Sequence, residues 1–394
     1  MRLLHTSDWH LGRTLHRADL RDAQAAVLDD LVGTVRAERI DAVLVSGDVF
    51  DRAVPSVDAV ALYDDALVRL RDAGARLVIT SGNHDSAARL GVGARLVAAA
   101  GVHVRTRPQG VGEPVVLQDR HGPVAIYGLP YLEPEAVRAS LPPDPAGGTE
   151  EPRGHAGVLG RAMACVRADL TARGGRSVVL AHAWVAGGEP SDSERDIGVG
   201  GAGQVAPSLF DGIDYTALGH LHGPHVLREG LRYSGSPLAY SFSEAGHAKG
   251  AWLVELDARG LARVERVPAP APRRLSVVEG RLDELLASAD HAPLEQHWLS
   301  VVLTDPVRPD DPMERLRARF PFVLVLAWRP AGAVADERTY GVRVAGRSDL
   351  EMAEEFVRHV RAGGSTSQEG AADAQERVLL AEAFEAGRLA VASR

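Results

Sequence analysis

Residues 3–12 read LLHTSDWHLG, an apolar run that ends in an Asp-x-His pair at Asp8 and His10. A short apolar run of this kind is typical of a buried β-strand. Apolar runs followed by metal-type side chains recur along the chain as far as His222. Because ligands of open α/β sheets gather outside the carboxyl ends of the strands, this pattern indicates an α/β fold with one site at the strand ends.

Apolar runs alternate with longer stretches of helical period over the first part of the chain. The expected strands are 2–5, 41–45 and 76–80, and the expected helices are 20–36, 57–72 and 86–100. Such alternation predicts βαβ units and a mainly parallel sheet. Further strands are expected at 124–128, 177–181 and 215–218, with hairpins within 225–267. Two layers of sheet flanked by helices are the simplest assembly of these elements.

The segment from Pro268 to Pro272 has proline at every second position and is typical of a stiff linker. Strand-like and helix-like runs continue beyond it and predict a small α+β domain. The Gly/Ser-rich stretch 363–374 indicates a tether before a last helix at about 375–391. The predicted domains are therefore 1–267, a linker at 268–274, a small domain at 275–350 and a C-terminal segment at 351–394.

The composition is that of a globular protein outside the membrane. Hydrophobic residues make up 45% and charged residues 25% of the chain, and no apolar run is long enough to cross a bilayer. The first residues contain no apolar signal core, and the single cysteine, Cys165, excludes an internal disulfide. We therefore expect a cytoplasmic protein. The net charge of −9 argues against a surface coated throughout by nucleic acid.

The chain contains one lysine, Lys249, in the stretch AGHAKG. A P-loop requires a lysine in a Gly-rich turn between a strand and a helix, and Lys249 is not in such a setting. If ATP drives the work of this protein, another chain must therefore bind the nucleotide.

Metal-type side chains follow five of the predicted strands, and their strand ends can converge on one cleft. Glycines at positions 47, 82 and 219 permit the tight turns that this convergence needs. Each motif by itself more often marks a turn or a hydrogen-bonded residue of the core. Because all of them occur together, in this order and each at a strand end, they favour a metal site. The predicted ligands are Asp8, His10, Asp48, Asn83, His182, His220 and His222.

These residue types suit a hydrolytic centre with two metal ions. A carboxylate supplies two oxygens that can bridge the ions, and imidazoles and a carboxamide complete the coordination without excess negative charge. A mixed nitrogen and oxygen set favours Mn, Fe or Zn over Ca or Mg. Two such ions hold a hydroxide at neutral pH and stabilise the attacking and leaving oxygens of a phosphorus centre.

The ordered motifs Asp-x-His, Gly-Asp, Gly-Asn-His-Asp, a later His and Gly-His-x-His resemble the calcineurin-type metallophosphoesterases. Within this superfamily the chain resembles SbcD, the family of nuclease subunits of the bacterial SbcCD complex. The segments that carry the likeness are HTSDWHLG (5–12), GDVFD (47–51), GHLH (219–222), SGSP (234–237) and YSFSE (240–244). The resemblance implies a four-layer αββα sandwich, a small α+β capping domain and a C-terminal helical segment.

The resemblance also implies the role of each site residue. One metal ion would be held by Asp8, His10, Asp48 and His222, and a second by Asp48, Asn83, His182 and His220, with Asp48 as the bridge. His84 would not bind metal but would protonate the leaving oxygen, and Asp85 would fix the ring of His84. The two divalent ions would be Mn²⁺.

The function implied by the resemblance is that of a DNA nuclease in repair, recombination and replication. It comprises Mn-dependent 3′-to-5′ exonuclease action on duplex ends and endonuclease action on single strands or hairpins. The implied partners are DNA, a second copy of the chain, and an SbcC-type ATPase that the C-terminal segment would bind in a heterotetramer with two nuclease subunits. Two alternatives remain, a phosphodiesterase or phosphatase for small substrates and a non-catalytic scaffold for DNA ends.

Several residues keep more than one interpretation. His16 and His225 either line the cleft or lie outside it, and Asp51 either supports a ligand or contacts substrate. Relatives of SbcD often carry a basic residue where this chain has Gly223 and Ala239. The last helix either folds back on its own domain or docks on the ATPase. Arginines of the small domain either contact phosphates or are solvated, and these are Arg273, Arg274, Arg281, Arg308, Arg315, Arg317 and Arg319.

Overall fold

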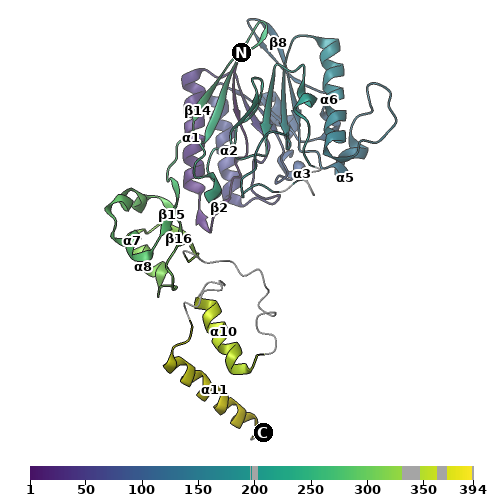
Figure 1. Cartoon of the computed structure of the whole chain (residues 1–394). Coiled ribbons are helices and arrows are strands. Elements are labelled where there is room, and N and C mark those ends of the chain that lie inside the picture. The colour runs from purple at the N-terminus through teal and green to yellow at the C-terminus, as the bar shows by residue number, and fades with distance from the viewer. Residues whose placement is uncertain (196, 198–202, 331–346, 362–370, 393–394) are drawn as a thin grey trace. The chain divides into compact units, whose positions relative to one another are not determined.

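The computed structural model describes residues 1–195, 197, 203–330, 347–361 and 371–392. The chain divides into two compact units, Met1–Pro272 and Arg273–Arg394 (Figure 1). Among the residues that the structure describes, no helix is both long and apolar enough to cross a membrane.

The first unit contains two six-stranded sheets. Parallel pairings form the middle of each sheet. Antiparallel strands complete one edge of the first sheet and both edges of the second. The first sheet has the order β14 (Gly260–Pro268), β13 (Gly250–Asp257), β1 (Arg2–Thr6), β4 (Ala42–Ser46), β5 (Arg76–Thr80), β6 (Val102–Arg105). The second has the order β11 (His225–Arg228), β12 (Leu231–Tyr233), β10 (Tyr215–Gly219), β9 (Arg176–His182), β8 (Gly122–Leu129), β7 (Val115–Asp119).

Helices cover the outer faces of the two sheets, which gives four layers. Helices α1 (Arg21–Glu38) and α2 (Val57–Asp72) lie on one side of the unit, and α6 (Gly154–Arg173) lies on the other (Figure 1). Between the sheets, residues such as Leu44 and Leu180 form one buried core, and Met163 of α6 belongs to a second core on the outer side. The predicted α/β sandwich with two sheet layers flanked by helices is therefore confirmed.

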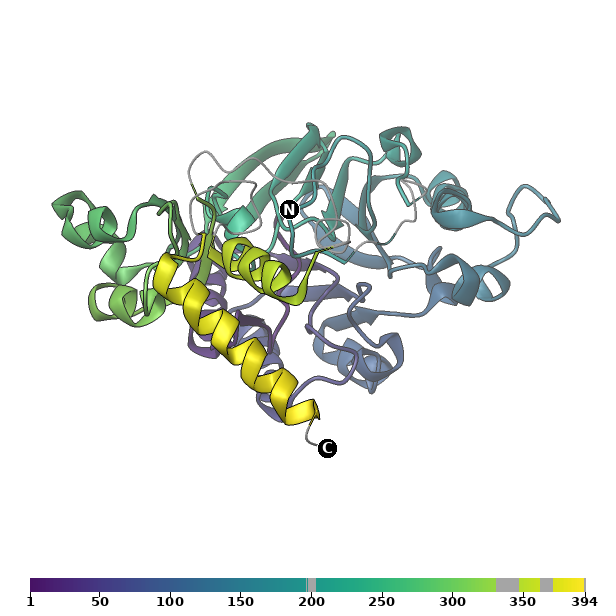
Figure 2. The same cartoon turned by 60° about the horizontal axis from the view of Figure 1, so that its bottom comes forward.

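The second unit has a small α+β fold of its own. Three parallel strands, β15 (Leu275–Gly280), β16 (Trp298–Leu303) and β17 (Val323–Trp328), pack with α7 (Leu282–Ala287) and α8 (Pro312–Arg319). Two further helices, α10 (Asp349–Arg361) and α11 (Ala374–Ala392), lie side by side (Figure 2). The predicted C-terminal helix is thus present, whereas most of the predicted tether, at 362–370, lies outside the described residues.

The predicted helix at 86–100 is wrong as a single element. The chain forms two one-turn helices, α3 (Ala87–Leu90) and α4 (Ala94–Val97), and a final 3₁₀ turn. Gly93 interrupts the helical period because its φ of +70° lies in the left-handed region. Strands β6 and β7 were not predicted, because each is short and contains polar residues that obscure the apolar pattern.

His5 links the two sheets inside the core. Its Nε2–H donates to the carbonyl of Leu218 at 3.1 Å, so its Nδ1 accepts the hydroxyl proton of Tyr215 at 2.9 Å. The side chain is fully buried. Burial disfavours the charged imidazolium and lowers the pKa of His5 from 6.5 to about 3.

This shift predicts a pH dependence of stability. As the pH falls below 6.5, the unfolded chain protonates His5 while the folded chain does not until about pH 3. The free energy of unfolding should therefore lose up to about 1.4 kcal/mol per pH unit from this group between about pH 6 and 4. Urea unfolding at several pH values measures how the free energy of unfolding changes with pH. This change per pH unit should be smaller in His5→Gln by that amount, and it should equal the wild-type value in the exposed His121→Gln. An equal pH dependence of the free energy of unfolding in wild type and His5→Gln would show that His5 is not the group responsible.

Glycines allow the ends of strands from both sheets to approach closely. A Cβ atom at Gly219, the last residue of β10, would lie 1.9 Å from the carbonyl oxygen of Ser46 in β4. A Cβ atom at Gly82, just after β5, would lie 2.1 Å from Oδ1 of Asp48. Only a residue without a side chain fits at these two places.

Gly219→Ala should therefore force the two sheets apart. We expect it to lower the free energy of unfolding by about 1–3 kcal/mol, as overpacking of a filled core does. Gly33→Ala, in the middle of α1, is the matched control because nothing lies within 4 Å of the added Cβ. That change should raise stability by about 0.5–1 kcal/mol. Urea unfolding measures both, and an unchanged stability in Gly219→Ala would refute the steric argument.

Candidate metal centre

The predicted ligands lie at neighbouring strand ends of both sheets. Asp8, Asp48 and Asn83 follow β1, β4 and β5 of the first sheet. His182 is the last residue of β9, and His220 follows β10, in the second sheet. Because parallel strands present their carboxyl ends at one edge, the two sheets bring these side chains to one place.

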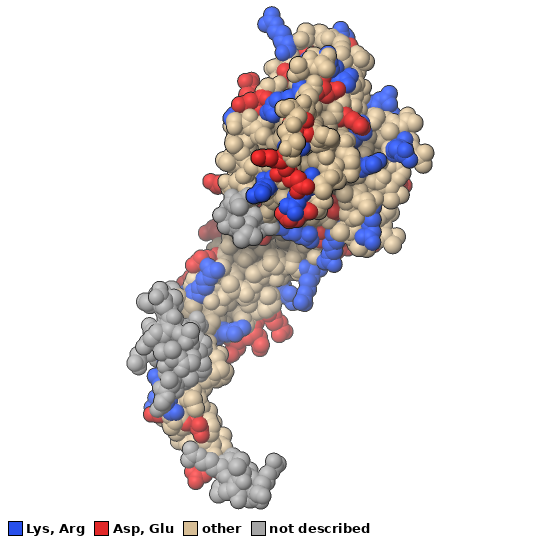
Figure 3. Space-filling model, turned by 90° about the vertical axis from the view of Figure 1, so that its right-hand side faces the viewer, with Lys and Arg blue, Asp and Glu red and all other residues tan. Residues whose placement is uncertain are grey.

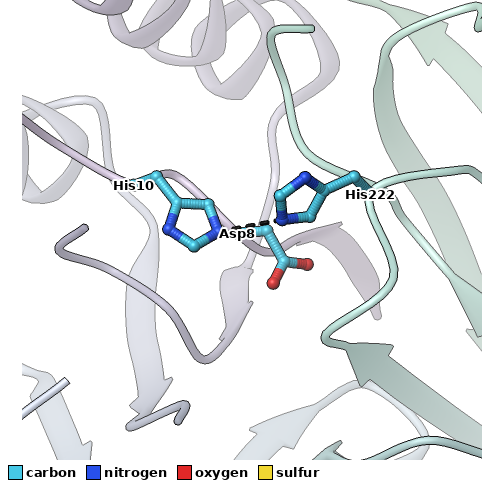
Figure 4. Close-up of side chains that lie close together, drawn as sticks. All are labelled: Asp8, His10 and His222. Carbon is cyan, nitrogen blue, oxygen red and sulfur yellow. Dashed lines mark hydrogen bonds between the residues drawn. The ribbon is translucent and has the colours of Figure 1, made fainter. Parts of the chain in front are cut away.

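Asp8, His10 and His222 form one potential metal-binding group (Figure 4). One ligand atom from each lies within 4.8 Å of the others, and the Nε2 atoms of the two imidazoles are 3.0 Å apart. All three side chains are buried. Figure 4 shows the two rings, from distant parts of the chain, pointing toward each other beside the Asp8 carboxylate.

Asp48 lies between this group and the remaining predicted ligands. Its Oδ2 is 3.6 Å from Nε2 of His10 and 3.6 Å from Nε2 of His182. Asp48 also belongs to two further potential metal-binding groups, one with His10 and His84 and one with Asp8 and His182. Its carboxylate is thus placed where an anion shared by two ions would be needed.

Asn83 joins His182 and His220 on the other side of Asp48. Its Oδ1 is 2.8 Å from Nε2 of His182 and 3.3 Å from Nδ1 of His220. The Nδ1–H of His182 donates to the carbonyl of Ser46 at 2.9 Å, so its Nε2 has no proton. The lone pairs of the Asn83 oxygen and of this nitrogen therefore face each other at 2.8 Å and repel. A cation bound by both atoms would remove this repulsion, so the residues fit a metal ion.

Backbone conformations at the site support a functional role. Four of the predicted ligands have positive φ, namely Asp8 (54°), His10 (46°), Asp48 (49°) and His220 (110°). Residues other than glycine adopt this region at a cost of about 1–3 kcal/mol each, and such residues cluster at functional sites. The strain is consistent with side chains that are aimed by their loops rather than by relaxed backbone geometry.

Burial sets the electrostatics of the centre. It raises the pKa values of Asp8 and Asp48, and the Asp48 charge raises that of Asp8 further. Burial lowers the pKa values of His10 and His220, and it lowers that of His182 to about 4. Neutral imidazoles are metal ligands, and a bound divalent cation would compensate the buried carboxylates. Nδ1 of His10 has no hydrogen-bond partner among the described residues.

His84 also reaches the centre, but Asp85 does not hold its ring as predicted. The Nδ1–H of His84 donates to the carbonyl of Asp51 at 2.8 Å, and its Nε2 lies 3.9 Å from Oδ2 of Asp48. The Asp85 carboxylate instead accepts backbone N–H groups of Val49, Phe50 and Gly82 at 2.9–3.1 Å. The prediction for Asp85 is therefore corrected, because this side chain ties together the loops after β4 and β5.

The structure shows where the three residues with more than one interpretation lie, namely His16, His225 and Asp51. His16 is exposed and stacks on Phe242, and His225 contacts the carbonyl of Glu189 at 3.0 Å. Among the described residues, neither belongs to a potential metal-binding group. Asp51 lies nearer the centre, with Oδ1 3.8 Å from Nδ1 of His10. Asp51 therefore holds the ring of His84 through its carbonyl, while its carboxylate lies near His10 without a hydrogen bond to it.

Sequence reasoning missed two residues that contact His222. The hydroxyl of Ser193 hydrogen-bonds with Nδ1 of His222, and Oε1 of Glu194 accepts the backbone N–H of His222 at 2.6 Å. Both belong to the loop after β9. The available signal was the polar run SDSE at 191–194, which follows a strand that ends in His182.

Two family models match the chain. The model described as calcineurin-like phosphoesterase matches residues 1–224. The model of the SbcD C-terminal domain, described as type 5 capsule protein repressor C-terminal domain, matches residues 271–361. The presence of both matches in this order confirms the resemblance to SbcD-type nuclease subunits.

Solved structures with similarity to the chain have low sequence identity. TT1561 of Thermus thermophilus is 15% identical, with 67% of this chain and 98% of that chain covered and a TM-score of 0.38. A dimetal phosphatase from Danio rerio is 14% identical, with 68% and 99% covered and a TM-score of 0.39. GAP50, the anchor in the inner membrane complex of Plasmodium, is 11% identical, with 85% and 99% covered and a TM-score of 0.40.

The central position of Asp48 leads to a prediction about metal-dependent stability. Mn²⁺ at about 100 times its dissociation constant should stabilise the wild type by about 2.7 kcal/mol per site. Asp48→Asn should lose most of this gain. The metal-free variant should be as stable as wild type or more stable, because a buried carboxylate is replaced by a neutral isostere. Thermal unfolding with and without Mn²⁺ measures both effects.

Asp65→Asn is the matched control, because Asp65 lies on the exposed face of α2 and pairs with Arg69. It should respond to Mn²⁺ as the wild type does. Full Mn²⁺ stabilisation of Asp48→Asn would show that this carboxylate is not a ligand.

Proposed function

The chain belongs to the calcineurin-like phosphoesterase family, and from this premise we propose that it is the nuclease subunit of an SbcCD-type complex. The observation that carries the proposal is the combination of two features. One is the buried nitrogen and oxygen ligand set around Asp48, and the other is the SbcD C-terminal domain at 271–361. We propose Mn²⁺ as the ion and the cytoplasm as the compartment.

The proposed ligand assignment follows the two sides of Asp48. Asp8, His10, Asp48 and His222 would hold one ion, and Asp48, Asn83, His182 and His220 the other. When bound, two such ions supply a hydroxide nucleophile at neutral pH and stabilise the attacking and leaving oxygens. The chain itself contributes a largely buried set of side chains, since all of these residues except Asn83 are buried.

His84 is the proposed proton donor to the leaving oxygen. The Asp51 carbonyl holds the ring through Nδ1–H, and this leaves Nε2 free to carry the transferred proton. Burial lowers the pKa of His84, while the Asp48 carboxylate opposes this effect by favouring the protonated ring. In this assignment Asp85 positions the Asp48 and Asn83 loops and makes no contact with the reacting atoms.

DNA is the proposed substrate, with 3′-to-5′ exonuclease action on duplex ends and endonuclease action on single strands or hairpins in repair, recombination and replication. Charges on the visible face of the first unit are interspersed in sign (Figure 3), so phosphate contacts are expected to be local. In the second unit, Arg273, Arg315 and Arg319 already make internal contacts. Of the arginines that the sequence analysis named in this unit, four are exposed and make no side-chain hydrogen bond or ion pair to described residues, namely Arg274, Arg281, Arg308 and Arg317. We propose that these contact phosphates.

An SbcC-type ATPase is the proposed partner, since Lys249 is buried and is not part of a P-loop. Helices α10 and α11 expose apolar side chains at Phe356, Val360, Val378 and Leu379. Exposed apolar side chains in such numbers indicate an interaction surface. We propose that this surface binds the ATPase, and that α11 therefore both packs on α10 and docks on the partner.

A homodimer is proposed for the nuclease subunit, within a heterotetramer that contains two copies of each chain. The first unit also exposes apolar residues in several places, and some of them lie on α2 and around α4. Among these are Val57, Val60, Val92 and Leu96. Their exposure supports an interface on this part of the unit.

End-labelled duplex and hairpin DNA test the proposed activity. Degradation should require Mn²⁺ and should stop with a chelator. His84→Ala should cleave about 10²–10⁴-fold more slowly, the usual loss when a general acid is removed. His121→Ala, at an exposed turn far from the centre in sequence, should cleave like the wild type.

The assay also separates the alternatives. Turnover of small chromogenic diesters without any DNA cleavage, even after the ATPase is added, would favour a small-substrate phosphodiesterase. DNA binding without cleavage, unaffected by His84→Ala, would favour a scaffold.

A further inference from the structure

His222 is held by side chains on the side opposite its proposed metal-binding nitrogen. Its Nε2 faces Nε2 of His10, and its Nδ1 hydrogen-bonds with the hydroxyl of Ser193. The same hydroxyl lies 2.5 Å from Oε1 of Glu244. All of these groups are buried, with Glu244 1% and Ser193 8% exposed. Three residues from distant parts of the chain therefore form one chain of hydrogen bonds.

Glu244 acts only as an acceptor in this arrangement. Its Oε2 forms a close ion pair with the ammonium group of Lys249 and also accepts the backbone N–H of Tyr240. Lys249 donates further to the carbonyl of His222 and to the hydroxyl of Ser236, at 2.8 and 2.9 Å. The only lysine of the chain is thus used to neutralise a buried carboxylate next to the site.

The direction of the protons follows from these contacts. The Ser193 hydroxyl carries one proton, and the Glu244 carboxylate beside it carries none. The hydroxyl must therefore donate to Glu244, which leaves its oxygen to accept a proton from Nδ1–H of His222. An imidazole with the proton on Nδ1 presents a lone pair at Nε2, the atom that faces His10 and Asp8.

The other imidazoles of the centre are oriented differently. His182 and His84 donate their Nδ1–H groups to main-chain carbonyls, of Ser46 and Asp51. A carbonyl can only accept, so the backbone fixes the tautomer of each ring. Nδ1 of His10 has no hydrogen-bond partner among the described residues. His222 thus differs from His182 and His84, because side chains rather than main-chain carbonyls set its tautomer.

We propose that Ser193 and Glu244 are positioning residues that hold His222 in the tautomer with the proton on Nδ1 and so raise the affinity of one of the two metal sites. The inference rests on the proposed ligand assignment. Hydrogen-bond partners of metal-binding histidines typically contribute about 10–100-fold in metal affinity. Lys249 keeps Glu244 ionised, and Glu194 and Arg13 fix the loop by contacts to the backbone of His222 and Ser193.

Mn²⁺ binding to the full chain, followed by electron paramagnetic resonance of the free ion, tests this proposal without a nuclease assay. The wild type should bind two ions. Ser193→Ala should bind one of them about 10–100-fold more weakly and the other unchanged. Ser193→Thr keeps the hydroxyl and should restore the affinity. Glu244→Gln should weaken the same site, because the amide can donate to Ser193 and reverse the relay.

Ser140→Ala is the matched control, since its hydroxyl also donates a hydrogen bond. Its acceptor is the backbone carbonyl of Val137, and the residue belongs to the 3₁₀ turn after α5 (Pro134–Val137). It should bind both ions as the wild type does. Thermal unfolding of the metal-free variants monitors the fold.

Two results would overturn the inference. One is wild-type affinity at both sites in Ser193→Ala. The other is that Ser193→Ala weakens Mn²⁺ binding equally at both sites and destabilises the metal-free protein, while Ser193→Thr restores neither property. The serine would then only support the loop. A wild type that binds no Mn²⁺ would instead refute the proposed function, so the two failures are distinguishable.

Discussion

The structure depends on the close approach of strand ends from two sheets around the buried carboxylate of Asp48. Glycine at 82 and 219 makes this approach sterically feasible, because any side chain there would overlap Asp48 or the backbone of β4. The approach places ligand-type atoms from opposite sheets within a few ångströms of one another. Without it, the same residues would lie on separate surfaces and could not bind one ion together.

This approach has an energetic cost that the rest of the fold must offset. Carboxylates at Asp8 and Asp48 are buried, burial lowers the pKa values of His10, His182 and His220, and several candidate ligands have strained backbone conformations. Such features lower stability in the metal-free protein and gain their value when a cation compensates the charge. The large apolar cores on either side of the second sheet supply the stability that permits this arrangement.

The second unit has its own small core and presents a different kind of surface. Several of its arginines are consumed by internal contacts, and others remain exposed, so charge count alone would overstate the area available to a polyanion. Its terminal helices pair with each other through Arg361 and Glu376 yet leave apolar side chains uncovered. The candidate metal centre and the exposed apolar surface of the terminal helices thus belong to separate units.

The sequence by itself determined the alternation of strands and helices, the order of the candidate ligands and their placement at strand ends, because apolar periodicity and strand-end motifs are local signals. It also indicated α2 and β5 with their observed bounds. Only the tertiary structure decided that Asp85 binds backbone amides rather than His84, that 86–100 breaks at Gly93, and that Glu244 reaches His222 through Ser193. Hydrogen-bond partners of this kind come from segments far apart in the chain, and packing alone brings them together.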